Sequence, residues 1–293
     1  MWVFLNDRFV HKEEAVVSVF DHGFLYGDGV YETIRSYGPG IFMRDQHLAR
    51  LQRSAEAIGL AIPIPCSQWP DLLHESMNRN EVGNDRVDAY LRVTISRGEG
   101  EIGLDPGLCP RPTVVIMAKE LQSFPPAFSR DGVSLTVAKT RRNLPEALSP
   151  QIKATNFLNN ILAKRESIAA GTFDSLLLNW RDDVTECTIS NLFFISGRTL
   201  HTPALDCGIL DGITRTIVMS LAQEEGLPVH EGRYQIADLR QAEECFLTNT
   251  TMEIMPVTKI DAFSIGNGLP GPLTRRLQAR FAASRTRFLE PIS

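Results

Sequence analysis

The chain has 293 residues, of which 43% are hydrophobic and 22% charged, and its formal net charge is -5. This composition predicts a folded protein with a substantial core and excludes global disorder. The acidic balance offers no field that would attract nucleic acid or an anionic membrane surface, so we expect a small-molecule partner. A length of about twice the commonest domain size predicts two domains.

Neither a membrane span nor a metal site is expected from the sequence. The apolar runs are far shorter than the roughly 20 residues of a transmembrane helix, and the apolar start of the chain stops at Asn6 without a cationic segment before it, which is atypical of a secretory signal. The five cysteines contain no C-x-x-C pair and the six histidines no H-x-x-x-H pair. This pattern indicates reduced thiols, no bound metal and a cytoplasmic location.

The first part of the chain predicts a sheet covered by helices. Short β-rich runs separated by glycines predict strands, and apolar residues at helical spacing predict two helices between them. The expected strands are 15–20, 29–35, 87–96 and 112–118, and the expected helices are 45–58, with Asp45 as cap and Gly59 as stop, and about 69–77.

A Pro-Pro pair after the first strands interrupts both periodicities, and a strand pattern restarts at Gly132. We therefore expect a small N-terminal domain at 1–119, an interdomain linker at 120–128 and a larger domain at 129–293. Alternating strands and helices predict a mixed α/β fold for the larger domain. Its expected strands are 132–138, 174–179, 191–196 and 244–248, and its expected helices are about 157–170, 214–225 and 272–288.

Residues 98–103 read G-x-G-x-x-G after a strand, a pattern typical of dinucleotide sites. Such a site needs a helix directly after the glycines, because the helix N-terminus holds the pyrophosphate. Here residues 104–110 contain two prolines and a glycine, and Glu99 and Glu101 would repel phosphate groups. We interpret this motif as a loop without a nucleotide.

Lysine is rare in this chain, with six lysines against 24 arginines. Lys153 comes just ahead of an apolar helical segment, where partial burial would favour the neutral, nucleophilic form of its amine. An ordinary lysine at the start of a helix fits the same local pattern.

The order of the motifs around Lys153 favours the first interpretation. The string DHGFLYGDGVYETIR at 21–35 resembles the N-terminal signature of class IV (fold type IV) pyridoxal-phosphate aminotransferases. Five more strings resemble that family in the correct order: HLARL at 47–51, the segment around Lys153 at 150–160, VTECTISNLF at 184–193, GILDGITR at 208–215 and TNTTMEIMP at 248–256. The resemblance covers about residues 2–285. It implies two α/β domains with the cofactor in the cleft between them, and a homodimer.

The resemblance also implies pyridoxal 5'-phosphate as cofactor, with a role for each matching residue. Lys153 would carry the cofactor covalently and, once displaced by substrate, move a proton between the substrate Cα and the cofactor C4'. Glu186 would keep the pyridine nitrogen protonated, with a solvated turn carboxylate as the alternative. Leu210 would pack under the ring. The phosphate would be bound by Arg50, Gly212, Ile213, Thr214 and Thr250, with 212–214 at a helix N-terminus.

Substrate recognition is expected mainly on two strands of the first domain. The candidates are Tyr31, Thr33 and Arg35 on one strand, Tyr90 and Arg92 on the next, and Thr251 farther along the chain. Alternate residues project from one face of a strand, so each strand presents its candidates together. An inward-facing arginine needs an anion, which a substrate carboxylate supplies. The alternative for Arg35 or Arg92 is a structural ion pair with an acid such as Glu32 or Asp88.

Subgroup features are mixed. The strand Tyr90-Leu-Arg92 and the GEIGLDP loop at 100–106 are similar to branched-chain aminotransferases, which favours L-branched-chain amino acids, 2-oxoglutarate and amino-acid biosynthesis. Against this, Phe157 stands where those enzymes usually have a tyrosine, and TTME at 250–253 replaces their T-A-A-E.

Other features are similar to two further subgroups. Thr33 and the TEC string at 185–187 resemble 4-amino-4-deoxychorismate lyases, in which a threonine hydroxyl over the cofactor would help to protonate the methylene carbon when pyruvate is eliminated. The Thr250–Thr251 pair together with Tyr31 resembles D-amino-acid transaminases, although their R-x-H carboxylate trap is not visible.

Our leading hypothesis is therefore a transaminase that moves an amino group between an amino acid, preferably L-branched-chain, and a 2-oxo acid such as 2-oxoglutarate. The alternatives are the lyase, which would release 4-aminobenzoate and pyruvate, the D-amino-acid transaminase, and a catalytically silent binding protein on the same fold. The presence of Lys153, Glu186 and Arg50 argues against the silent protein.

Overall fold

The computed structural model describes residues 1–290, and the chain forms two compact units. Unit 1 consists of Met1–Gln122, Ile152–Asn156 and the C-terminal segment from Arg285, and unit 2 of Ser123–Gln151 and Phe157–Ser284. The first change of unit falls inside the expected linker at 120–128. The units differ from the simple split at 119 and 129, because the segment that carries Lys153 returns to unit 1 and the C-terminal segment joins it.

Unit 1 is built on a seven-stranded sheet in the order β16-β4-β3-β5-β6-β1-β2, in which all neighbours are antiparallel. Its strands are β1 (Trp2–Leu5), β2 (Arg8–His11), β3 (Gly29–Tyr37), β4 (Gly40–Phe42), β5 (Ala89–Ser96), β6 (Thr113–Glu120) and β16 (Leu289–Glu290). The expected strands 29–35, 87–96 and 112–118 are confirmed as β3, β5 and β6.

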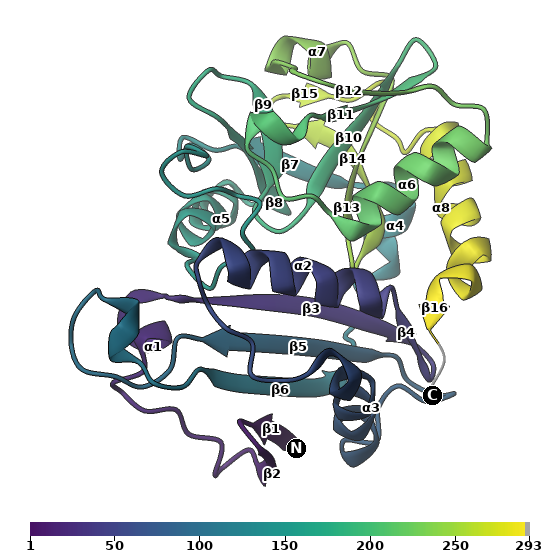
Figure 1. Cartoon of the computed structure of the whole chain (residues 1–293). Helices are drawn as coiled ribbons and strands as arrows, with labels where there is room; N and C mark the ends of the chain where they lie inside the picture. The colour runs from purple at the N-terminus through teal and green to yellow at the C-terminus, as the bar shows by residue number, and fades with distance from the viewer. Residues whose placement is uncertain (291–293) are drawn as a thin grey trace. The chain divides into compact units, whose positions relative to one another are not determined.

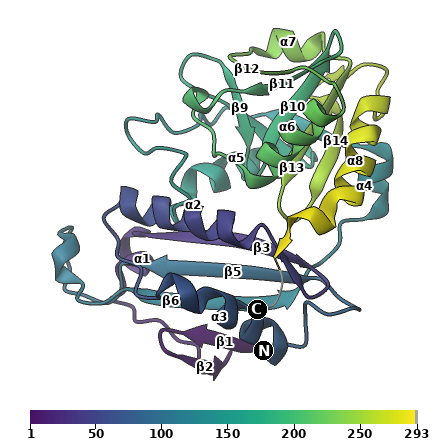
Figure 2. The same cartoon turned by 45° about the vertical axis from the view of Figure 1, so that its right-hand side comes forward.

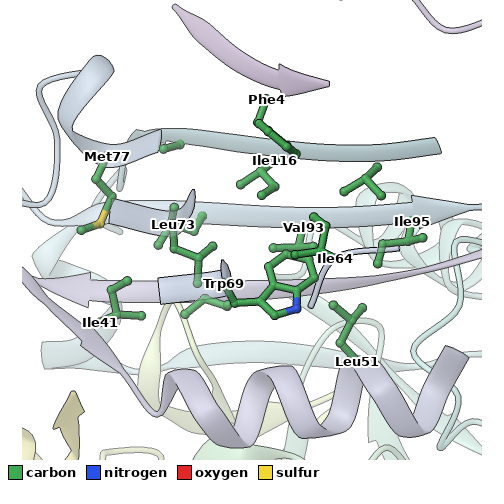
Figure 3. Close-up of a cluster of buried hydrophobic side chains, with 14 of the residues drawn as sticks. Phe4, Ile41, Leu51, Ile64, Trp69, Leu73, Met77, Val93, Ile95 and Ile116 are labelled. Carbon is green, nitrogen blue, oxygen red and sulfur yellow. The ribbon is translucent and has the colours of Figure 1, made fainter. Parts of the chain in front are cut away.

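Helices α2 (Arg44–Ala57) and α3 (Trp69–Arg79) bury one face of this sheet, and α2 runs along β3 (Figure 1). Leu51 of α2 and Trp69 and Leu73 of α3 pack with Val93 and Ile116 of the sheet in one hydrophobic core (Figure 3). The expected helices are confirmed, because their apolar spacing matches this buried face. The unit also contains the short helix α1 (His22–Tyr26) and the 3-10 turns Cys66–Gln68 and Pro106–Leu108.

The opposite face of β3 and β5 carries polar and aromatic side chains. Burial alternates along β5, where Leu91 and Val93 are fully buried and Tyr90 and Arg92 are half-exposed. The register pairs Thr33 of β3 with Arg92 of β5, so the candidates of the two strands share one face.

Unit 2 contains a nine-stranded mixed sheet. Its strands are β7 (Val133–Val137), β8 (Asp174–Leu178), β9 (Val184–Cys187), β10 (Asn191–Ser196), β11 (Thr199–Pro203), β12 (Val229–Gly232), β13 (Glu244–Asn249), β14 (Glu253–Ile260) and β15 (Phe263–Ser264). Strands β7, β8, β10 and β13 confirm the strands expected in the second half.

The sheet of unit 2 closes on itself. Strands pair in the order β10-β13-β14-β7-β8-β9, and β9 pairs back with β10 through Glu186 and Asn191. The apolar side chains of this ring, including Leu176, Leu192 and Leu247, form a continuous core. This closure places Glu186 on β9 directly beside Asn191 on β10.

Five α-helices of the described residues belong to unit 2: α4 (Pro126–Asp131), α5 (Leu158–Ala170), α6 (Ile213–Glu224), α7 (Ile236–Arg240) and α8 (Pro272–Ser284). Helices α6 and α8 pack together and against β13, whereas α5 covers β7 and β8 (Figures 1 and 2). The expected helices near 157–170, 214–225 and 272–288 are confirmed, the last with a 3-10 end at Arg285–Phe288. Helix α4 begins inside the expected linker, where a Pro at the first turn suits a helix start.

Two local expectations are wrong. Residues 15–20 form no strand, although Val16 and Val19 favour one, because no neighbouring strand satisfies their backbone. Helix α2 is preceded by Met43, not capped by Asp45. Asp45 lies in the first turn, where its negative charge is still favourable near the positive helix end.

The glycine motif at 98–103 is confirmed as a loop, because a 3-10 turn and no α-helix follows it. Gly98 has φ +95, and a Cβ at this position would lie 1.8 Å from the carbonyl oxygen of Arg111. The glycine therefore permits a close backbone approach.

Candidate active site

Lys153 is held by its main chain against strand β3. Its carbonyl accepts a hydrogen bond from the Tyr31 N–H at 2.9 Å, and its own N–H donates to Ser54 Oγ of α2 at 3.1 Å. Two residues later, the Thr155 N–H donates to the Gly29 carbonyl at 2.9 Å. Lys153 Nζ lies 4.5 Å from the centroid of the Tyr31 ring. The main chain of Lys153 is thus fixed relative to one strand of the sheet, with its amine beside the Tyr31 ring.

Tyr31 also contacts the guanidinium of Arg92. Burial raises the pKa of the Tyr31 phenol well above its usual value, so the hydroxyl stays protonated. The Arg92 Cζ lies 4.1 Å from the centroid of the Tyr31 ring. Such a contact supports the guanidinium without neutralising it. Within residues 1–290, Arg92 has no carboxylate at ion-pair distance.

Arg35 has a different environment from Arg92. Its Nη2 donates to Asp88 Oδ2 at 2.8 Å, and its Cζ lies 4.2 Å from the centroid of the Tyr37 ring. Arg35 thus makes the structural ion pair that was the alternative to substrate binding. The ring of Tyr90, its neighbour on β5, is 5.1 Å from the Nζ of Lys119.

Arg50 of α2 is bound by the carboxylate of Glu32 on β3. Its Nε donates to Oε1 at 2.7 Å and its Nη2 to Oε2 at 2.9 Å, while His47 Nδ1 lies 2.8 Å from Oε2. Burial alone would raise the pKa of Glu32, but the Arg50 guanidinium and His47 hold that pKa well below its usual range. Glu32 therefore pairs with neither Arg35 nor Arg92.

Glu186 is buried on strand β9, not in a solvated turn. Its Oε1 accepts hydrogen bonds from Arg142 Nε at 3.1 Å and Nη2 at 2.8 Å. Its Oε2 accepts from Asn191 Nδ2 and from the Leu210 N–H, both at 3.1 Å. These donors fix the orientation of the carboxylate within unit 2.

The start of helix α6 presents hydrogen-bond donors that the helix itself does not use. Gly212 is the N-cap residue, and the Thr216 N–H makes the first intrahelical bond to its carbonyl at 2.9 Å. The N–H groups of the first turn therefore have no partner within the helix. The Thr214 hydroxyl is buried and has no hydrogen-bond partner in the described part of the chain. A phosphate dianion suits such a helix start and would satisfy this hydroxyl.

Thr250 and Thr251 lie in the turn between β13 and β14. The Asn249 Oδ1 accepts hydrogen bonds from the Thr251 N–H at 3.0 Å and from the Met252 N–H at 2.8 Å. This turn follows Thr248, which is the register partner of Asn191 on the neighbouring strand.

Within unit 1 the structure brings together Lys153, Tyr31, Thr33 and Arg92, and holds Arg50 on the buried side of β3. Within unit 2 it brings together Glu186, Leu210 and Gly212, through Asn191. Sequence reasoning missed Glu32 and His47 as partners of Arg50, and Arg142 and Asn191 as partners of Glu186. Three of these residues could have been found from the sequence, because Glu32, His47 and Asn191 lie inside the motifs at 21–35, 47–51 and 184–193.

Among residues 1–290 no three His, Cys, Asp or Glu side chains are grouped to hold a metal ion. None of the helices in that range is both long and apolar enough to cross a bilayer. All five cysteines are free thiols.

Comparison with known sequences identifies relatives of this chain. The sequence model of the amino-transferase class IV family matches residues 29–260. A Methanocaldococcus jannaschii protein, named provisionally as a branched-chain-amino-acid aminotransferase, is 39% identical over 98% of both chains. The aminodeoxychorismate lyase of Bacillus subtilis is 35% identical over 94% of this chain and 92% of its own, and a D-alanine aminotransferase of Listeria monocytogenes is 34% identical over 98% and 97%.

Solved structures give the same result. The branched-chain amino acid aminotransferase of Escherichia coli superposes with a TM-score of 0.95 at 27% identity, covering 100% of this chain and 99% of its own. Another branched-chain amino acid aminotransferase, solved with pyridoxamine 5'-phosphate, gives a TM-score of 0.93 at 30% identity, covering 100% and 98%. The branched-chain aminotransferase of the archaeon Thermoproteus uzoniensis, solved with norvaline, gives a TM-score of 0.90 at 30% identity, covering 100% and 99%.

Proposed function

Because the chain belongs to the class IV aminotransferase family, and is therefore a transaminase that depends on pyridoxal 5'-phosphate, we propose that it acts on L-branched-chain amino acids with 2-oxoglutarate as amino acceptor. The observation that carries the catalytic part of this proposal is the environment of Lys153, whose main chain is bonded to β3 and whose amine lies 4.5 Å from the centroid of the Tyr31 ring. The choice of branched-chain substrates is supported by the M. jannaschii relative and the solved branched-chain aminotransferases. A catalytically silent protein would have no need of this lysine.

The residues of the chain fit the cofactor. Bound pyridoxal phosphate supplies an electron sink for the negative charge that develops at the substrate Cα. Lys153 would hold the cofactor and then move the proton between the substrate Cα and the cofactor C4'. Glu186, oriented by its donors in unit 2, would accept a hydrogen bond from the ring nitrogen, and Leu210 would pack against the ring.

The phosphate would be bound at the start of α6. The N–H groups of Ile213 and Thr214 and the buried Thr214 hydroxyl supply donors there, and Gly212 is the N-cap residue at which the helix starts. Arg50 and Thr250 are the further ligands that we propose. Arg50 is the cation among these ligands, so its orientation by Glu32 matters for cofactor affinity.

Arg92 is the residue that we propose to bind the substrate carboxylate. It is half-exposed on the polar face of the sheet, it rests on Tyr31, and no carboxylate of the described chain neutralises it. Tyr90 and Thr251 complete the proposed substrate contacts. Arg35 is a weaker candidate than Arg92, because its guanidinium already forms an ion pair with Asp88.

A second candidate is the 4-amino-4-deoxychorismate lyase reaction. Thr33 is the observation that favours it, since its register partner is Arg92 and its neighbour on the same face is Tyr31. A hydroxyl there would be near a substrate carboxylate bound by Arg92 and could assist proton transfer when pyruvate leaves. The B. subtilis relative named as a lyase supports keeping this candidate.

We also propose a cytoplasmic homodimer. The segment before β3 and the loop after β5 expose a set of large apolar side chains, which we call the apolar patch: Val16, Val17, Val19, Phe20, Phe24, Leu25, Ile102 and Leu104. The His22 Nε2 is 2.9 Å from the Glu101 carbonyl oxygen, and the Gly103 N–H donates to the Tyr26 hydroxyl, so the two segments are bonded together. Contiguous exposed apolar surface of this kind favours a protein interface, and a second copy is the partner that the family implies.

The free cysteines support the proposed cytoplasmic location, because thiols stay reduced in that compartment.

The half-reaction of the purified holoenzyme tests this proposal. We expect L-leucine or L-valine alone to convert the bound cofactor to its amine form, with loss of the visible absorbance and a gain in the ultraviolet. Conversion by D-alanine alone would favour the D-amino-acid transaminase. Pyruvate and 4-aminobenzoate formed from aminodeoxychorismate, without conversion by any amino acid, would favour the lyase. A Lys153→Ala protein is the control and should show neither the visible band nor turnover.

A further inference from the structure

Asn191 stands at the point where the sheet of unit 2 closes. It is the first residue of β10, it pairs with Glu186 across to β9, and on its other side it pairs with Thr248 of β13. The side chain is buried. Asn191 therefore lies between Glu186 on one neighbouring strand and Thr248 on the other. Glu186 is the carboxylate of the proposed cofactor site.

The amide of Asn191 bonds to two parts of that site. Its Nδ2 donates to Glu186 Oε2 at 3.1 Å and to the Leu210 carbonyl at 2.9 Å. The Leu210 N–H in turn donates to the same Glu186 oxygen at 3.1 Å. The carboxylate, the amide and the loop before α6 thus form a closed hydrogen-bonded triangle.

The other end of the amide explains the glycine at the start of α6. A Cβ on Gly212 would lie 2.0 Å from Asn191 Oδ1, which is a severe overlap. The backbone of Gly212 itself has φ -76 and ψ 130, a conformation that any residue adopts. Glycine is therefore favoured here by the space that Asn191 fills, with the Arg215 Cβ as a further close neighbour at 3.2 Å, and not by the backbone conformation.

We propose that Asn191 is a positioning residue that sets the Glu186 carboxylate and the phosphate-binding turn at Gly212 relative to each other. This inference rests on the proposed function, because both groups act on the bound cofactor. Through its Nδ2 the side chain orients the carboxylate toward the ring nitrogen, and through its Oδ1 it fixes how closely the first turn of α6 approaches. Arg142 supplies the counter-charge of Glu186, whereas Asn191 is neutral, so its replacement changes geometry without changing net charge.

The first experiment measures the dissociation constant of pyridoxal phosphate from the full-length protein by absorbance titration. Asn191→Ala removes two hydrogen bonds and should weaken binding about tenfold. With 1-deaza-pyridoxal phosphate, which has no ring nitrogen for Glu186, the loss should be at least about threefold smaller. Equal losses with both compounds would contradict a role through Glu186.

The second experiment is a double-substitution cycle with Gly212→Ala. In the native background the added Cβ meets Asn191, so we expect cofactor binding to weaken at least about tenfold and the unfolding temperature of the cofactor-free protein to fall. In the Asn191→Ala background the overlap with Oδ1 is gone and only the milder 3.2 Å contact with the Arg215 Cβ remains, so Gly212→Ala should then change cofactor affinity less than about threefold. Equal effects of Gly212→Ala in the two backgrounds would overturn the proposal.

Asn80 provides the matched control. It is an asparagine of unit 1 that makes three hydrogen bonds, to the Trp2 N–H, the Trp2 carbonyl and the Ser76 carbonyl. Asn80→Ala should lower the unfolding temperature and leave cofactor affinity within about twofold of the native value. If the native protein itself bound no pyridoxal phosphate, the proposed function would fail; if it binds normally and the cycle shows no coupling, only the inference about Asn191 fails.

Discussion

Glu32 holds Arg50 by two hydrogen bonds, 2.7 Å to Nε and 2.9 Å to Nη2, although one residue lies on a strand and the other on the helix that covers it. The Glu32 carboxylate is completely buried and the Arg50 guanidinium nearly so. Removing one partner from such a pair leaves a buried charge without its counter-ion, which costs far more than the loss of an exposed pair.

We therefore expect Glu32→Ala to lower the free energy of unfolding by about 3–5 kcal/mol. The matched control is Glu75→Ala on α3, because Glu75 pairs with Arg79 one turn away and both are substantially exposed. That substitution should cost less than about 0.5 kcal/mol. Urea denaturation of the three proteins measures both values, and a similar cost for the two variants would show that the Glu32 pair contributes no more than a surface pair.

His47 predicts a pH dependence of stability. Burial lowers the pKa of His47 below its usual 6.5, against the effect of Glu32 and with the help of the Arg50 and Lys153 charges. As the pH falls below 6.5, the unfolded chain binds a proton at this position before the folded chain does, so stability decreases in that window. His47→Asn keeps a donor for Glu32 but does not titrate. Denaturant unfolding at several pH values between about 7 and 5.5 should show a shallower decline for this variant. Parallel declines would mean that His47 does not titrate differently in the two states.

Arg92 and Arg35 lie on the same face but should respond differently to substitution. Arg92→Gln should raise the KM for 2-oxoglutarate at least about tenfold, because a charge-assisted contact to substrate is lost. Arg35→Gln breaks the pair with Asp88 and should lower the unfolding temperature with less than about a threefold change in KM. Steady-state kinetics and thermal unfolding of both variants separate the two roles, and an unchanged KM in the Arg92 variant would remove it from the substrate site.

The apolar patch predicts the effect of a charge on assembly. Phe24 is 73% exposed and lies in this patch, whereas Leu269 is 63% exposed on a loop of unit 2. Phe24→Glu should shift the protein from dimer to monomer in sedimentation experiments, because an unpaired carboxylate would be buried in the interface. Leu269→Glu should leave the sedimentation coefficient unchanged. A native protein that sediments as a monomer at all concentrations would refute the dimer.

The periodicity of the sequence predicted most of the regular elements, because the alternation on β5 and the helical spacing on α2 are local patterns that the burial of one face reinforces. The apolar run at 15–20 shows the limit of this rule: its local pattern predicts a strand, but a strand needs a partner that the pattern does not supply. Its side chains are instead exposed in the apolar patch.

The partners of the charged residues were harder to predict. The sequence offers Glu32 as a partner of Arg35 or Arg92, which lie near it in the same sheet, yet Glu32 projects from the opposite face and binds Arg50. The alternation of the strand predicts which face the Glu32 side chain occupies. It does not predict that helix α2 packs on that face, because this contact is tertiary. Arg142 stands outside every quoted motif, so its bond to Glu186 could not be found from motif order.

The return of residues 152–156 to unit 1 has a consequence for protein engineering. A chimera made by joining the first 122 residues of one relative to the remainder of another would leave the amine of Lys153, which we propose to be catalytic, next to a strand from a different parent. The hydrogen bonds that the peptide groups of Lys153 and Thr155 make with β3 would then span two parental sequences. Subfamily recombination should therefore transplant this five-residue insert together with the N-terminal half, as a discontinuous module.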